Sequence, residues 1–71
     1  DDILSDAVKA LNDVSKTELH ADQLARDYIN GQADLQEVMA AQAKASLKIQ
    51  YAVTTVNAVV NTFKELTQMQ V

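Results

Sequence analysis

The chain has 71 residues, with ten acidic and six basic side chains and a net charge of −4, so it lacks the basic stripe that binding to nucleic acid requires. It contains no Cys and a single His, which excludes a disulfide framework and a thiolate metal site. No apolar run approaches the roughly 18 residues of a membrane span, and a core of this size is expected to give marginal stability.

Residues 1–30 are predicted to form an N-terminal helical arm. Two apolar stripes recur at helical spacing, and their members are Ile3, Leu4, Ala7, Leu11 and Val14, then Ala21, Leu24, Ala25, Tyr28 and Ile29. Between them, Glu18 and Asp22 fall on the apolar side of a straight helix. Because Ser15 and Glu18 have the spacing of a capping box, we predict a kink or restart near Ser15. A continuous helix with Glu18 at its edge is the alternative.

Asn30-Gly31 is the clearest break in the chain, which has one Gly and no Pro. Residues 31–34 are predicted to form a loop. Asp34 can accept hydrogen bonds from the first free N–H groups of a following helix, with Glu37 three residues later, near the positive end of the helix dipole. The second helix is therefore predicted to start at Leu35.

Residues 35–71 are predicted to form one long amphipathic C-terminal helix. Its apolar positions advance by three and four residues in turn, the period of a coiled-coil seam, with Gln42 as the interruption. These positions, the heptad seam, are Leu35, Val38, Ala45, Ile49, Ala52, Val56, Val59, Phe63 and Leu66. All but the two alanines are predicted to pack against helices of the first half and of neighbouring subunits. At about 1.5 Å per residue the helix would be roughly 55 Å long, which favours membership of an assembly.

A second apolar row predicts contacts on another side of the same helix. Its members are Ala40, Leu47, Tyr51, Ala58 and Met69, of which the last four are the predicted second-face contacts. From Ile49 to Thr62 many residues are β-branched, which lowers intrinsic helix propensity. Packing on both sides is therefore expected to hold this helix.

The end of the second helix is predicted to dock against a partner. It has no Gly stop, and no cation follows Lys64, so its last carbonyl groups lack donors from the chain itself. We expect Met69, Gln70 and Val71 to form this C-terminal docking segment. Since the sequence opens on Asp1 without an initiator Met, it is expected to be the ordered part of a longer polypeptide.

No group of residues in the sequence predicts catalysis, a cofactor or a metal ion. His20 stands without a second His or a nucleophile at a suggestive spacing, and is expected to be a solvated helix residue. Neither Asp22 with Asp27 nor the acids near the N-terminus have the spacing of a calcium loop. Gly31 alone cannot form a phosphate-binding loop. The chain is therefore predicted not to be an enzyme.

Several short motifs stand in order along the second half of the chain. They are Asp34-Leu35-Gln36-Glu37-Val38-Met39, Lys44-Ala45, Asn57, Val59-Val60, Phe63, Glu65-Leu66 and Met69-Gln70-Val71. In this order they resemble the C-terminal part of FliE, a family of flagellar hook–basal body proteins. That family usually has basic residues on either side of the Asn, where this chain has Val56 and Ala58.

The resemblance implies a structural adaptor at the base of the bacterial flagellar rod. The implied partners are copies of itself, a membrane-ring protein, proximal rod proteins and export-gate proteins. Charge and hydropathy, as described above, predict no nucleic acid partner and no direct membrane span. The implied location is the basal body, on the periplasmic side of the cell envelope, reached through the flagellar export apparatus. The predicted fold is all-α: a helical hairpin of a kinked N-terminal segment and one long C-terminal helix, assembling into a multi-subunit helical tube.

Two other functions remain as alternatives. An inner-rod or needle-type subunit of a virulence-related type III secretion system would share the hairpin, although the ending Met69-Gln70-Val71 favours the flagellar interpretation. A small acidic helical chaperone would use residues 1–34, which hold eight acidic and three basic residues, to bind a basic client. A chaperone should be a stable helical monomer or dimer, whereas an adaptor should fold poorly alone or polymerise.

Overall fold

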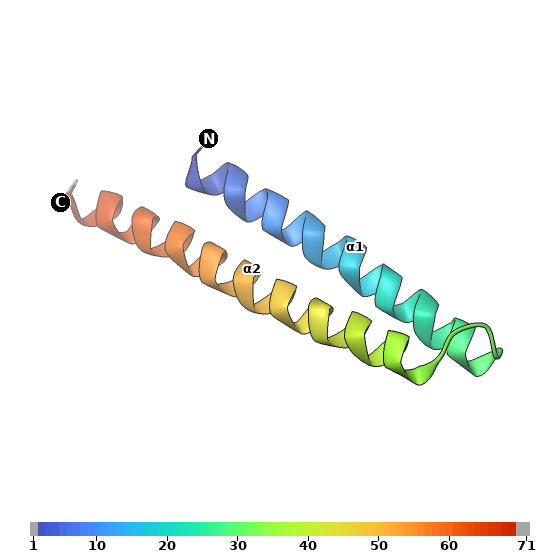
Figure 1. The fold of residues 1–71 in the computed structure, drawn as a ribbon. Helices are drawn as coiled ribbons and strands as arrows, with labels where there is room; N and C mark the ends of the chain where they lie inside the picture. The colour runs from blue at the N-terminus through green and yellow to red at the C-terminus, as the bar shows by residue number, and fades with distance from the viewer. Residues whose placement is uncertain (1, 70–71) are drawn as a thin grey trace.

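The computed structural model describes residues 2–69, which form two α-helices and no strand. Helix α1 spans Ile3–Ile29 and helix α2 spans Leu35–Met69. The two helices run antiparallel as a hairpin, with the connecting loop at one end (Figure 1). The molecule measures 60 × 15 × 15 Å, so it is a rod rather than a globule. The prediction of an all-α hairpin is confirmed.

Helix α1 is one unbroken helix. It begins after Asp2, whose carboxylate Oδ1 accepts a hydrogen bond from the backbone N–H of Ser5 at 2.8 Å. It then passes through Ser15 without a restart, and the Thr17 hydroxyl donates to the carbonyl oxygen of Asp13 at 2.7 Å. The Thr17 hydroxyl thus bonds within a continuing turn of the same helix. The predicted restart near Ser15 is corrected accordingly, and the continuous alternative holds.

Helix α1 ends in a hydrogen-bonded glycine stop. The backbone N–H of Gln32 donates to the carbonyl of Asp27 at 2.7 Å, and that of Gly31 donates to the carbonyl of Tyr28 at 3.0 Å. This is the pair of bonds of a Schellman motif, which requires a left-handed residue, and Gly31 has a φ of 78°. The sequence signal at Gly31 therefore has a direct physical cause.

Replacing Gly31 by Ala is expected to destabilise the hairpin by about 1 kcal/mol. A Cβ atom built at this position meets nothing within 4 Å, so the loss arises from the left-handed backbone and not from a clash. Gly31→Asn should cost less, because Asn tolerates this conformation better than Ala. Urea unfolding followed by circular dichroism measures both changes, and an Ala variant as stable as the parent would contradict the assignment.

Helix α2 begins with a reciprocal capping box. The backbone N–H of Glu37 donates to Asp34 Oδ1 at 2.9 Å, and the backbone N–H of Asp34 donates to Glu37 Oε1 at 3.3 Å. The prediction that Asp34 caps the second helix is confirmed.

Four threonines in the β-branched part of α2 and beyond it donate their hydroxyls to the carbonyl four residues earlier, and these are Thr54, Thr55, Thr62 and Thr67.

The contact between the two helices is built mainly from alanine. The buried residues, here called the helix–helix core, are Ala7, Ala10 and Ala21 of α1 and Val38, Ala41, Ala45, Ala52 and Thr55 of α2. Within residues 2–69 no side chain larger than Val is buried. Thr55 is tolerated there because its hydroxyl donates to the carbonyl of Tyr51 at 2.9 Å. Small side chains bury little apolar area, so the hairpin gains little stability per turn.

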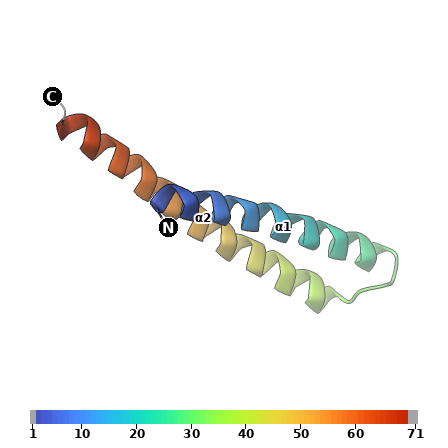
Figure 2. The same ribbon diagram turned by 90° about the horizontal axis from the view of Figure 1, so that it is seen from above.

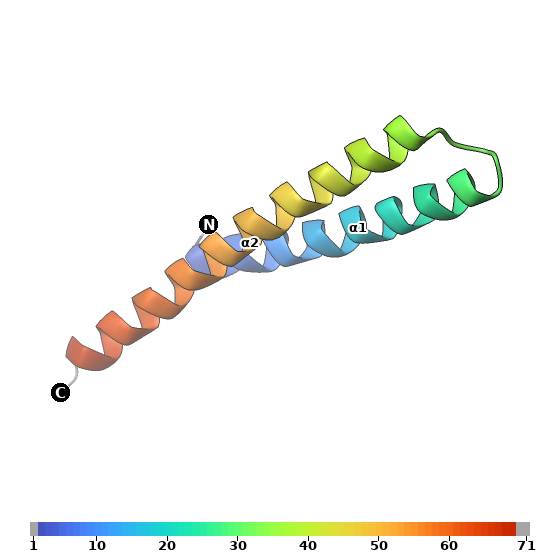
Figure 3. The same cartoon turned by 90° about the horizontal axis from the view of Figure 1, so that it is seen from below.

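Helix α2 extends past the beginning of α1. It has 35 residues against 27 in α1, a difference of about 12 Å at 1.5 Å per residue. The final turns of α2 project beyond the first turn of α1 in two further views (Figure 2, Figure 3). Every residue from 60 to 69 is exposed, and this segment is here called the overhang. The overhang thus has no helix of its own hairpin to cover it.

Candidate functional site

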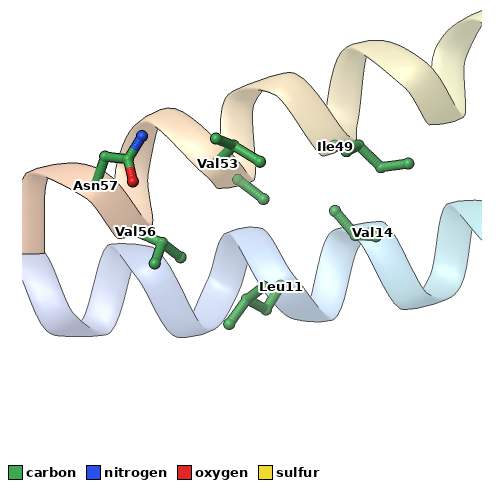
Figure 4. A pocket seen from close by; sticks show the side chains of 7 residues that line it. Leu11, Val14, Ile49, Val53, Val56 and Asn57 are labelled. Carbon is green, nitrogen blue, oxygen red and sulfur yellow. The ribbon is translucent and has the colours of Figure 1, made fainter. Parts of the chain in front are cut away.

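An apolar groove runs along one flank of the hairpin. Leu11 and Val14 of α1 lie opposite Ile49, Val53 and Val56 of α2, with Asn57 at one end (Figure 4), and Ala52 also lines the groove. The groove has a volume of about 300 Å³. Leu11 and Val53 are 52% and 54% exposed, so both would lose apolar surface to a partner. We call this flank, with the groove, the apolar flank.

The apolar surface continues from the groove onto the overhang. Val60 lies four residues after Val56, which places the two side chains on one side of α2. Val60 and Phe63 line a second hollow together with Lys64 and Thr67. Phe63 is 65% exposed. A partner could therefore contact hydrophobic side chains over several successive turns.

The opposite flank of the hairpin carries a basic cluster. Asp13, Lys16 and His20 of α1 lie beside Lys44 and Lys48 of α2, around a polar hollow. Lys48 Nζ and Asp13 Oδ2 are 2.8 Å apart and join the two helices, while their side chains remain 36% and 54% exposed. With three lysines around one aspartate, this region is positive on a chain whose net charge is −4. We call it the basic flank.

The ion pair should make hairpin stability depend weakly on pH. The hydrogen bond from Lys48 and its charge lower the pKa of Asp13 below the ordinary 3.8, and the charges of Lys16 and Lys44 lower it further. Because the folded-state pKa is depressed, the stabilisation is complete above about pH 4 and is lost as the pH falls through the folded value. Since both groups are largely exposed, the effect is small and screened by salt.

We therefore expect Asp13→Asn to lower the melting temperature slightly at neutral pH and to have no effect once the pH is well below 3.8. Thermal melts across the acid range, at low and high salt, measure this difference. Lys48→Met removes the same pair, so the double variant should lose no more than either single variant. A difference between Asp13→Asn and the parent that grows on acidification would contradict the sign.

The predicted heptad seam divides between buried and exposed positions. Val38, Ala45 and Ala52 face α1, and Val56 and Val59 are half-buried. Leu35, Ile49, Phe63 and Leu66 are exposed in the single hairpin. The face of α2 that meets α1 combines these three buried seam residues with Ala41 and Thr55 beside them. The exposed seam residues are therefore available to other chains, and their role in subunit packing stays a prediction.

The predicted second-face residues lie on or near the basic flank. Leu47 and Tyr51 each lie three residues after a lysine of that flank, and are 65% and 60% exposed. Ala58 is half-buried and Met69 is exposed. Gln70 and Val71, predicted for C-terminal docking with Met69, lie outside the described residues. These roles also stay predictions.

Sequence reasoning missed two features of these flanks. It did not single out Leu11 and Val14 as the α1 side of a groove, although their apolar spacing was visible. It also did not bring Lys16 together with Lys44 and Lys48, because that cluster depends on the register between the helices. The Asp13–Lys48 contact joins residues 35 positions apart, and no local pattern encodes it.

Among residues 2–69, no three His, Asp or Glu side chains converge as they would around a metal ion. Neither described helix is long and apolar enough to cross a bilayer.

Comparison with known proteins identifies one family. The sequence profile of the flagellar hook-basal body complex protein FliE matches residues 1–71, so it includes the first half, where the motifs of the second half gave no guidance. No curated protein and no solved structure matches the chain. Because the match spans every residue, the chain belongs to the FliE family and is a structural component of the flagellar basal body.

Proposed function

We propose that this protein is a structural adaptor at the base of the flagellar rod. Several copies would join the membrane ring and the export gate to the proximal rod proteins, on the periplasmic side of the cell envelope. The chain would reach that place through the flagellar export apparatus. In the assembled state the hairpins would form part of a helical tube. Family membership supports the location in the basal body, and the exposed faces of the hairpin support an adaptor role there.

The overhang is the observation that carries this proposal. A helix that projects about 12 Å beyond its hairpin partner exposes Phe63, Leu66 and Met69, of which Met69 is 81% exposed. Exposed hydrophobic side chains in sequence along a helix are typical of protein interfaces. The apolar groove adds a second contact surface. A subunit that must bind more than one neighbour needs such separate surfaces.

The proposal is tested by capturing the neighbours of the overhang in cells. A photo-crosslinking amino acid at Phe63 is expected to trap a basal-body protein in membranes of motile cells. The same amino acid at Ala43, an exposed position that lines neither flank, is the matched control and should trap much less. Basal bodies isolated from the same cells should contain the protein. A protein missing from them, or Phe63 adducts with unrelated proteins alone, would refute the adaptor role.

Loss of the gene is a second test of the same role. Cells that lack the protein are expected to form membrane rings without rods, because nothing would connect the two. Electron cryo-tomography of such cells shows rings and rods directly. Normal rods in these cells would refute the adaptor proposal.

A further inference from the structure

We propose that the partner of the two flanks is a second copy of this chain, lying alongside in the same direction with its basic flank on the apolar flank of the first. The inference rests on the proposed function in one respect, that several copies meet in the basal body. It specifies which surfaces meet, in which orientation and at which register.

The apolar flank becomes acidic toward the loop. Glu18 and Asp22 lie seven and eleven residues after Leu11, which is two and three helical turns, so they stand on the same side of α1. Both are exposed. This placement accounts for the two acids that interrupt the apolar pattern of α1. Going from the overhang toward the loop, the flank is therefore first hydrophobic and then negative.

The basic flank shows the matching order. Tyr51 lies one turn from Lys48 on the side away from the loop, whereas Lys44 lies one turn from it on the loop side. Lys16 and Lys44 share a polar hollow with Lys48. Going from the overhang toward the loop, this flank is therefore first aromatic and then positive as far as Lys44, beyond which Glu37 lines a hollow with Lys44 and His20.

Because the two helices are antiparallel and their register is known, residues of the two flanks can be compared by their position along the long axis of the hairpin, here called their height. Lys48 contacts Asp13, so Tyr51, one turn further along α2, lies at about the height of Leu11. Lys44 lines one hollow with residues Thr17 and His20, so it lies at the height of Glu18. If a second copy is placed beside the first without a shift along the long axis of the hairpin, Tyr51 of one copy therefore lies against the apolar groove of the other. The same placement sets Lys16 and Lys44 against Glu18, with Asp22 one turn nearer the loop.

This double match favours parallel copies over a two-fold dimer. In a two-fold pair each flank would meet itself, which leaves the acidic and basic clusters without opposite charges. When the basic flank of one copy binds the apolar flank of a neighbour, the apolar flank of the first copy stays free. Each copy can therefore bind one neighbour on each side. Such a contact produces a ring where the rotation closes and a helix where it does not. Either outcome suits a subunit of a tubular structure.

Charge reversal tests the electrostatic half of the contact. Lys16→Glu with Lys44→Glu should abolish motility in soft agar, and Glu18→Lys with Asp22→Lys should do the same. The chain carrying all four changes should recover motility, because the opposite charges meet again across the interface. Circular dichroism of each purified variant shows whether the hairpin is intact. Helical variants whose fourfold combination does not recover at all, or double variants that swim normally, would overturn the proposal.

Disulfide trapping tests orientation and register, and it does not depend on motility. The chain has no Cys, so Leu11→Cys and Tyr51→Cys introduce single thiols, and each is made in a differently tagged copy. Co-expressed copies are expected to form a mixed disulfide under mild oxidation, whereas neither variant alone should dimerise. Ala43→Cys, exposed and off both flanks, is the control partner and should give no mixed product.

The outcomes separate the inference from the function on which it rests. Dimers of Leu11→Cys alone would show a two-fold pairing and overturn the proposal. Basal bodies that contain both variants but no mixed disulfide would overturn it too, while leaving the adaptor role intact. A photo-crosslinker at Tyr51 that traps another basal-body protein and no second copy would assign the basic flank to that protein. Absence of the chain from basal bodies would refute the adaptor role and this contact together.

Discussion

Replacing Ala52 by Leu is expected to destabilise the hairpin by about 1–3 kcal/mol, a large fraction of what a 71-residue unit can lose. Ala52 is 3% exposed and lies in the helix–helix core, where its neighbours across the contact are also small. The adjoining apolar groove can take up only part of a longer side chain, because Ala52 is almost fully buried, so the rest presses on α1. Thermal melting by circular dichroism measures the loss, with an osmolyte added if the parent is too unstable to give a folded baseline.

Ala43→Leu is the matched control for this change. Ala43 is exposed on α2, and Leu is nearly as good a helix former as Ala, so this variant should melt close to the parent. Comparison of Ala52→Leu with Ala43→Leu separates the effect of packing between the two helices from the effect of helix propensity within α2. Equal melting temperatures for the two variants would show that α1 and α2 do not pack through alanine as described.

Replacing Phe63 by Ala is expected to abolish motility while leaving the hairpin almost as stable as before. The ring is 65% exposed on the overhang, so the single chain loses little buried area when it is removed. In the assembly the same ring is proposed to be covered by a neighbour, where truncation of a buried aromatic anchor costs roughly 2–4 kcal/mol of binding. Swimming in soft agar and the amount of protein in isolated basal bodies measure the effect.

Asn61→Ala serves as the control for Phe63→Ala. Asn61 is also exposed on the overhang, but it lies half a helical turn away from Phe63 and lines none of the hollows described. This variant should swim like the parent. If Phe63→Ala instead melts several degrees lower and still swims, the ring serves the hairpin and not an interface.

The local features of the fold could be predicted from sequence because their causes are local. A lone Gly31 with its positive φ and the Asp34–Glu37 pair act through neighbours only a few residues away. The same local reasoning was misleading at Ser15, where a hydroxyl followed by Glu18 has the spacing of a cap but lies within a continuing helix. Spacing alone cannot say whether the backbone leaves the helix at that residue.

The face of α2 that meets α1 could not be fixed from sequence. The heptad seam mixes small and large side chains, and the structure buries its alanines while it leaves large members such as Ile49 and Phe63 exposed. The face that meets α1 has Ala41, Ala45 and Ala52, which let the helices approach closely, whereas Ile49 lies to one side and lines the apolar groove. Large side chains that a hairpin leaves at its edges are a better sign of an interface than of the core.

The alanine contact also determines how the hairpin responds to force. Ile3, where α1 begins, and Met69, where α2 ends, both lie at the end of the hairpin away from the loop (Figure 1). A force that pulls these two residues apart therefore peels the helices from each other instead of shearing them. Each step of peeling releases alanine methyl groups worth roughly 0.8 kcal/mol apiece, and no bulky side chain of the helix–helix core must be withdrawn at once. A small force is therefore expected to separate the two helices, one turn at a time, along the whole hairpin.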